Sequence, residues 1–373
     1  MKTMKNTKTI RIIQIVIAAV LMFTLLNFMA CEASIPEEWV ATFDLESFPY
    51  EEDLRSKGVF VIDMESGAVG LAVNENKKMM GASTIKIMTA LVILEELGEE
   101  DGLDQSVEVP EAIYAGFNTD DPNTVGSSLS GIALFQDTLT YRDCLYALMM
   151  RSGNEAANIL AYNLTAGMNS DVGSFSKFAE MMNDKAAEIG CVNTRFANAH
   201  GLHEEGNWTT AHDLAKIAQY AYEKYPLFRD ICNRQEYRMP SNYVFTRGYR
   251  IQNGNALVRA PRDSKIDDDD EPAVNIYYRD YAQGVKNGAL DVVWYRDDDG
   301  EWAVQNGIAN LVSIGSKGGK TYLVVTLEAP YKTGGLLEGQ SRLHYAHVDH
   351  LLIYDEWLFA GNDERFSFGV NDS

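Results

Sequence analysis

Residues 82–97 read ASTIKIMTALVILEEL, and this stretch constrains the fold more than any other. Its apolar residues recur at helical spacing without proline or glycine, which predicts a helix. Ser83 and Lys86 are three residues apart and share one face at the helix start. A lysine whose pKa is lowered by burial or a nearby positive charge can activate a serine hydroxyl. A lone S-x-x-K also fits a capping serine and a solvated lysine, and the spacing recurs at Ser174 and Lys177.

Two further short motifs give this pair its context. Ser152-Gly153-Asn154 is the only S-x-N in the chain, and Lys286-Asn287-Gly288 lies well beyond it. Each motif alone is weak. Their order and spacing, however, match the S-x-x-K, S-x-N and K-T-G set of penicillin-binding proteins and class A β-lactamases, which are acylating serine enzymes. Lys286 also supplies a positive charge that could lower the pKa of Lys86.

Longer stretches around the motifs narrow the resemblance to one family. Residues 145–157 read LYALMMRSGNEAA, residues 194–202 read TRFANAHGL, and Gly284-Val285 precedes the third motif. From about residue 58 to about residue 359, the chain resembles the D-alanyl-D-alanine carboxypeptidases, the low-molecular-mass penicillin-binding proteins of the S11 serine peptidase type. The resemblance implies an α/β (α+β) protein with the penicillin-binding/β-lactamase-like transpeptidase fold.

The resemblance also implies a reaction, the removal of the terminal D-alanine from peptidoglycan stem peptides through an acyl-enzyme that β-lactam antibiotics inhibit. Ser83 would be the nucleophile, Lys86 its base and Ser152 the relay of a proton to the leaving amine. The backbone N–H groups of Ser83 and Ala289 would form the oxyanion hole. The implied substrate-binding residues are Asn154 for a backbone amide, Lys286 for positive potential, Asn287 for the terminal carboxylate, Gly288 and Ala289 beside them, and Arg342 as a further carboxylate ligand. No cofactor is expected.

The third motif departs from the family at one position and has a competitor. Asn287 stands where the family has threonine, whose hydroxyl helps to hold the substrate carboxylate, and a literal K-T-G occurs at Lys332-Thr333-Gly334. The family's motif lies on a strand that two more strands and a final helix follow. Two strand patterns, at residues 308–314 and 321–329, follow Lys286, whereas only a glycine-rich turn and the last helix follow Lys332. This order favours Lys286, and an Asn amide can still donate a hydrogen bond.

Strand and helix signals are distributed unevenly along the chain. Residues 58–63 and 68–73 have strand patterns, residues 82–225 are mostly helical, and strand signals return from residue 235. A last helix is expected at 341–359. We therefore predict an antiparallel sheet built from both chain ends, with a mostly helical middle beside it. The expected organisation is a linker at 34–57, one serine D-Ala-D-Ala carboxypeptidase domain at 58–360 and a polar tail at 361–373.

Residues 1–33 are expected to be a signal peptide or an N-terminal membrane anchor. Four basic residues precede an apolar stretch at 12–30, which is typical of a signal peptide, although its length also fits an uncleaved anchor. Cys31 leaves lipidation open. We expect an extracytoplasmic protein, either secreted or anchored by its N-terminus to the outer face of the cytoplasmic membrane. The net charge of −22 argues against a nucleic-acid partner.

Neither the histidines nor the acidic runs predict a metal site. His344, His347 and His350 are spaced three apart in the expected last helix, which shapes a zinc site poorly. The acidic residues 267–271 lack the spaced ligands and the glycine of a calcium loop. We therefore predict no metal. The cysteines beyond the leader include no C-x-x-C and are expected to be buried free thiols: Cys144, Cys191 and Cys232.

Three other functions would share these motifs. A class A-like β-lactamase needs a positioned glutamate to activate the deacylating water, and we find no convincing loop for one. Asn287 motivates a weakly catalytic peptidoglycan-binding protein, and an endopeptidase that cuts cross-links would share every motif. Slow release of bound penicillin, as opposed to rapid turnover, would separate the carboxypeptidase from the β-lactamase.

Overall fold

The computed structural model describes residues 47–114, 117, 128–135, 138–166, 173–241, 246, 248–260, 275, 277–296, 302–331 and 345–360. The chain divides into two units after Thr42, and all of these residues belong to the second unit. Predictions about the leader, the polar tail, Cys31, residues 267–271, Lys332-Thr333-Gly334, Arg342 and His344 lie outside the described residues. Those predictions stay predictions.

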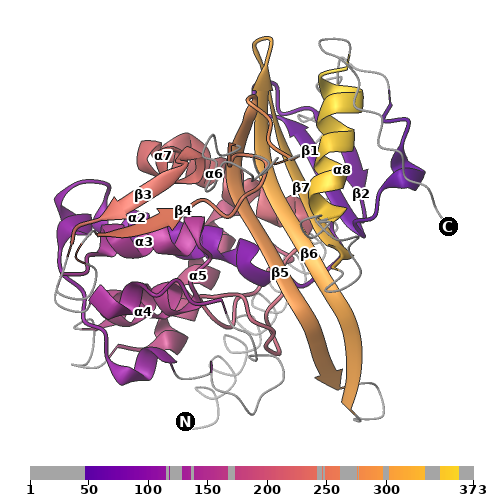
Figure 1. Cartoon of the computed structure of the whole chain (residues 1–373). Coiled ribbons are helices and arrows are strands. Elements are labelled where there is room, and N and C mark those ends of the chain that lie inside the picture. The colour runs from indigo at the N-terminus through magenta and orange to yellow at the C-terminus, as the bar shows by residue number, and fades with distance from the viewer. Residues whose placement is uncertain are drawn as a thin grey trace, which may run out of the picture. The chain divides into compact units, whose positions relative to one another are not determined.

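A five-stranded antiparallel sheet in the order β2-β1-β7-β6-β5 joins early and late parts of the chain (Figure 1). Its strands are β1 Gly58–Asp63, β2 Val69–Val73, β5 Ala282–Arg296, β6 Trp302–Lys317 and β7 Lys320–Pro330. β1 pairs with β7 along its whole length, from Gly58 opposite Leu327 to Asp63 opposite Tyr322. The predicted sheet from both chain ends is therefore confirmed.

Helices cover both faces of this sheet. Figure 1 shows α2 to α7 on one side and α8 on the other. The helical elements are η2 Glu51–Asp53, η3 Ala82–Ile85, α2 Lys86–Leu97, η4 Asp101–Asp104, η5 Glu111–Tyr114, η6 Ile132–Phe135, α3 Tyr141–Met150, α4 Asn154–Thr165, α5 Phe175–Ile189, α6 Ala211–Lys224, α7 Pro226–Asn233, α8 Tyr345–Ile353 and the π-helical turn η7 Tyr354–Leu358. A separate two-stranded sheet consists of β3 Glu236–Met239 and β4 Tyr249–Gln252.

The interior strand β1 is buried at every position because both of its faces are covered. Successive strand side chains point to opposite faces. Accordingly, Phe60 and Ile62 belong to the core of the helical layer, whereas Val59 and Val61 belong to the core that includes α8. The sheet is thus fixed between two apolar layers.

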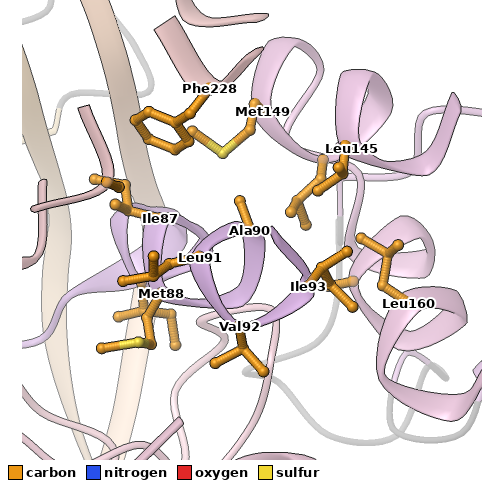
Figure 2. Close-up of a cluster of buried hydrophobic side chains, with 14 of the residues drawn as sticks. Ile87, Met88, Ala90, Leu91, Val92, Ile93, Leu145, Met149, Leu160 and Phe228 are labelled. Atoms are coloured by element: carbon orange, nitrogen blue, oxygen red, sulfur yellow. The ribbon is translucent and has the colours of Figure 1, made fainter. Parts of the chain in front are cut away.

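Helix α2 lies at the centre of the helical layer. Its residues from Lys86 to Leu94 are all buried, which is the pattern of a helix surrounded by protein. Figure 2 shows its side chains packed among Leu145, Met149, Leu160 and Phe228, which come from α3, α4 and α7. This packing holds the start of α2, where Lys86 lies, in one place.

Two helices begin or end differently from the prediction. The helix expected from residue 82 starts as the 3-10 turn η3 and becomes α-helical only at Lys86. Ala82 itself has φ +46°, outside the helical region. At the other end of the chain, α8 widens into the π-helical η7, in which the Phe359 N–H donates to Tyr354 O. Within the described ranges, no helix is long and apolar enough to cross a bilayer.

The second S-x-x-K is a helix cap. Ser174 Oγ accepts the Lys177 backbone N–H at 3.2 Å at the start of α5. Thr140 and Asp143 form a reciprocal capping box at the start of α3. Ser174 therefore has the ordinary role of a serine before a helix, and its spacing to Lys177 carries no chemistry.

Candidate active site

Ser83 and Lys86 meet where η3 passes into α2. Lys86 Nζ lies 2.8 Å from Ser83 Oγ, and the lysine is fully buried. Ala82, with φ +46°, turns the chain sharply just before Ser83. Gly201 packs against this turn so closely that a Cβ at position 201 would overlap the Ala82 carbonyl. The predicted nucleophile and base are therefore in hydrogen-bonding contact.

Three oxygen atoms surround the Lys86 amine. They are Ser83 Oγ, Asn154 Oδ1 at 2.7 Å and the backbone carbonyl of His200. Burial, and after it the positive charge of Lys286, hold the pKa of Lys86 well below its usual 10.5. A lysine with a lowered pKa is more often a neutral amine at neutral pH. Such an amine can accept the proton of a serine hydroxyl.

The second motif, Ser152-Gly153-Asn154, forms the tight connection between α3 and α4. Ser152 has φ +60°, a conformation that costs a non-glycine residue energy and is found most often at functional sites. Gly153 has no room for a side chain, because a Cβ would lie 2.8 Å from Ser130 Oγ. Asn154 is buried at the first position of α4, and its side chain joins the second motif to Lys86.

The third motif, Lys286-Asn287-Gly288, lies on β5 at the edge of the sheet. A Cβ at Gly288 would lie 2.9 Å from the backbone nitrogens of Ser83 and Thr84, so the strand lies directly against the nucleophile turn. Lys286 is only 1% exposed, and burial lowers its pKa to about 7. Its Nζ donates to the Asn287 carbonyl at 2.7 Å and lies 3.3 Å from Asn287 Oδ1.

The structure thus gathers the three motifs around one point. Ser83, Lys86 and Asn154 are in direct contact, and Gly288 lies against the Ser83 nitrogen. Two predicted residues adjoin these contacts in sequence: Ser152 on the turn before Asn154, and Ala289 on β5 after Gly288.

Residues 46–264 match the sequence pattern of the D-alanyl-D-alanine carboxypeptidases, peptidase family S11. The chain belongs to this family. It is 30% identical over 168 residues to the D-alanyl-D-alanine carboxypeptidase DacF of Bacillus subtilis (strain 168), an alignment that covers 44% of this chain and 38% of that relative. The chain therefore spans much less than the full length of this curated relative.

Solved structures show the same fold. The crystal structure of the Streptomyces K15 DD-transpeptidase matches with a TM-score of 0.56 at 23% identity, over 81% of this chain and 96% of that one. Penicillin-binding protein D2 from Listeria monocytogenes, in its cefotaxime-bound form, matches with a TM-score of 0.52 at 21% identity, over 74% of this chain and 91% of that one. The predicted α+β fold of the penicillin-binding DD-peptidases is confirmed.

Next to the second motif, Glu155 is a buried acid that the sequence analysis did not single out. Its Oε1 accepts the N–H and the hydroxyl of Ser130 at 2.6 and 2.7 Å, and the N–H of Gly131 at 2.9 Å. These bonds fasten the Ser130–Gly131 backbone to the start of α4. The charge of Glu155 raises the pKa of Lys86 and so partly opposes the effects of burial and of Lys286, which both lower it. An acid inside the apolar run that follows the S-x-N was the available signal.

The family segment at 194–202 lies beneath the nucleophile. The carbonyl of His200 accepts a hydrogen bond from the Lys86 amine. The next residue, Gly201, donates its N–H to Asn198 Oδ1 at 2.8 Å, and Asn198 Nδ2 donates to the Leu202 carbonyl at 3.2 Å. The Asn198 amide therefore fixes the turn that presents the His200 carbonyl. The resemblance identified this segment without giving it a role.

His350 of α8 contacts two strands of the sheet through its ring nitrogens. Its Nδ1 lies 2.7 Å from Ser313 Oγ on β6, and its Nε2 lies 2.9 Å from Thr326 Oγ1 on β7. Burial lowers the pKa of His350 to about 3, so the ring is neutral and links α8 to the sheet.

The three described cysteines are buried free thiols: Cys144, Cys191 and Cys232.

Proposed function

We propose that this protein is a serine-type D-Ala-D-Ala carboxypeptidase that removes the terminal D-alanine from peptidoglycan stem peptides through an acyl-enzyme. One observation carries the proposal, the buried Lys86 amine 2.8 Å from the Ser83 hydroxyl. Burial and the charge of Lys286 favour the neutral amine. Membership of the D-alanyl-D-alanine carboxypeptidase family supports the substrate class.

Acylation begins when Lys86 takes the Ser83 proton and Ser83 Oγ attacks the carbonyl carbon between the two D-alanines. Negative charge then develops on the carbonyl oxygen. We assign its stabilisation to the backbone N–H groups of Ser83 and Ala289, because preorganised donors stabilise such a charge strongly. The close approach of Gly288 to the Ser83 nitrogen supports this assignment, since it brings β5 to the same point.

The tetrahedral intermediate collapses by breaking the C–N bond. Lys86 returns its proton through Ser152 to the leaving nitrogen, and D-alanine departs as an amine. Water then attacks the ester carbonyl, gives a proton to Lys86, and releases the shortened peptide as Ser83 recovers a proton. Asn154 Oδ1 accepts a hydrogen bond from Lys86, which leaves its Nδ2 to donate to a backbone carbonyl of the stem peptide.

The terminal carboxylate of the substrate requires positive charge. We propose that Lys286 supplies this charge, with Asn287 as a hydrogen-bond donor and Arg342 as a further ligand. Asn287 Oδ1 faces the Lys286 amine at 3.3 Å, so the Asn287 Nδ2 remains to donate to the carboxylate. A bound carboxylate would raise the pKa of Lys286 from its value of about 7 and so keep the ammonium charged.

This chemistry supports a location outside the cytoplasmic membrane, where peptidoglycan is exposed. We propose that any attachment to the membrane is through the N-terminal residues, as their basic and apolar pattern indicates. β-Lactam antibiotics would be inhibitors, because they acylate the same serine and resemble the substrate's end.

A labelled penicillin tests the proposal on the purified soluble form. Mass spectrometry should place the adduct on Ser83, and Ser83→Ala should abolish it. Ser174→Ala is the matched control, since Ser174 has the same spacing to a lysine but caps α5. Slow release of the adduct together with D-alanine release from a D-Ala-D-Ala peptide supports a carboxypeptidase. Rapid penicillin turnover would indicate a β-lactamase, and no adduct at Ser83 would refute the assignment.

A further inference from the structure

Asn310 on β6 holds the backbone that leads into the nucleophile. The residue is 1% exposed, and its Nδ2 donates to the Met80 carbonyl at 2.7 Å and to the Gly81 carbonyl at 2.8 Å. Its Oδ1 accepts the Glu328 N–H at 2.7 Å. Every hydrogen-bonding group of this amide except one lone pair is therefore used, and both donors go to the segment before Ser83.

The sheet is irregular at the position of Asn310. The pairing of β6 with β7 shifts register between Ala309 and Leu311, on either side of Asn310. Glu328, opposite this shift, has φ +54°. Its carboxylate Oε1 accepts the Met80 N–H at 3.1 Å. Two strands thus bind both backbone polar groups of Met80, one through an amide and one through a carboxylate.

The segment held in this way has little freedom, and it carries the strained turn. The Gly81 carbonyl also accepts the Thr84 N–H at 3.1 Å and the Thr84 hydroxyl at 2.6 Å. Ala82 follows with φ +46°, a conformation that persists only when its surroundings impose it. Asn310 is also the register partner of Gly288, which lies against the Ser83 nitrogen. Strand β6 therefore contacts both sides of the proposed oxyanion hole, through the Asn310 side chain on the segment before Ser83 and through its pairing with β5.

We propose that Asn310 is a positioning residue for the acylation step. By fixing the Met80 and Gly81 carbonyls to β6, its amide keeps the Ser83 N–H aimed beside β5 and the Ser83 hydroxyl within reach of Lys86. This inference rests on the proposed acyl-enzyme function. Its effect falls on the rate of the chemical step, because the side chain is buried beneath the turn and does not touch the substrate.

Two variants of Asn310 and one control separate positioning from stability. Asn310→Ala removes both donors and the acceptor, and Asn310→Asp keeps the acceptor for Glu328 while removing the donors. Asn163→Ala is the matched control. The Asn163 Nδ2 also donates to two carbonyls, those of Glu108 and Ile159, and its Oδ1 accepts the Glu108 N–H. Asn163 lies near the end of α4 opposite to Asn154.

The concentration dependence of penicillin acylation gives the rate constant of the chemical step and the dissociation constant of the preceding complex. Asn310→Ala and Asn310→Asp should lower the rate constant about 10-fold to 100-fold, the range expected when a reacting group is displaced. The dissociation constant should stay within about threefold of wild type, because no binding group is removed. Asn163→Ala should acylate like wild type, even if its melting temperature falls as much as that of the Asn310 variants.

Hydrogen exchange of the peptide covering residues 79–86 provides a readout that does not need catalysis. Exchange should be faster in the Asn310 variants than in wild type or Asn163→Ala. If wild-type Ser83 is acylated and the Asn310 variants acylate at wild-type rates, the positioning role is refuted. If wild-type Ser83 is never acylated, the proposed function fails separately. In either case, hydrogen exchange in the Asn310 variants that is no faster than in wild type would refute the anchoring role of Asn310.

Discussion

Replacing Lys286 with methionine should stabilise the folded protein at neutral pH while it slows acylation. Lys286 is 1% exposed, and burial lowers its pKa from 10.5 to about 7. At 1.36 kcal/mol per pKa unit, this shift corresponds to about 5 kcal/mol against the buried ammonium. Methionine has a similar length and no charge, so it fills the same space without that cost.

The direction of the pH dependence follows from the two pKa values of Lys286. Below pH of about 7 the amine is protonated in both the folded and the unfolded states, and the folded protein bears the whole burial cost. Between about 7 and 10.5 the unfolded chain binds more protons, so wild-type stability rises with pH in this window. The advantage of Lys286→Met should therefore be largest below pH 7 and should shrink toward pH 10.5.

Urea unfolding at a series of pH values measures this difference. Lys177→Met is the control, because the Lys177 side chain is 42% exposed at the surface of α5. The free energy of unfolding of Lys286→Met should exceed that of wild type by up to about 5 kcal/mol at pH 6, with the excess falling by about 1.4 kcal/mol per pH unit above pH 7. An excess that does not change with pH, or a variant less stable than wild type throughout, would refute the reasoning.

Five further substitutions, at four positions, test the roles of the motifs. Lys86→Ala should abolish penicillin acylation while the protein still folds, because the base and nucleophile act as one unit; a wild-type acylation rate would exclude Lys86 as the base. Gly288→Ala should lower both the melting temperature and the acylation rate, since its Cβ would lie 2.9 Å from the Ser83 nitrogen and overpacking costs about 1–3 kcal/mol. Asn287→Thr should keep or improve D-alanine release, and Asn287→Ala should weaken it by about 1–3 kcal/mol if a charge-assisted hydrogen bond is lost. Thr333→Ala should leave release unchanged, and the opposite pattern would show that Lys332-Thr333-Gly334 is the functional third motif.

The sequence predicted the parts of the site that depend on short-range geometry. Ser83 and Lys86 touch because residues three apart lie on one face of any helical turn. The strand that carries Lys286 was placed by the two strand patterns that follow it, and β6 and β7 occupy those residues. The antiparallel sheet followed from strand signals at both ends of the chain.

Local patterns could not predict features that arise from tertiary contacts. The positive φ of Ala82 at the start of the first helix was not predicted, and Gly201, which packs against the Ala82 carbonyl, is more than 100 residues away in sequence. Asn310 is one of several polar residues in β6, and only the structure shows which carbonyls its amide reaches. For Glu155 the sequence shows an acid in an apolar run, but not its partners, because Ser130 and Gly131 lie outside its own helix.

The site couples reactivity to stability through two buried lysines. Burial, and after it the charge of Lys286, lowers the pKa of Lys86, and burial lowers the pKa of Lys286, so both amines destabilise the folded state at neutral pH. The fold tolerates them because α2, which begins at Lys86, is surrounded by apolar side chains. Loosening that packing would admit water to the Lys86 amine and let its pKa rise toward the usual value. Substitutions in the α2 core should therefore reduce acylation at neutral pH in variants that are still folded. Measuring the acylation rate and the unfolding transition on the same samples tests this.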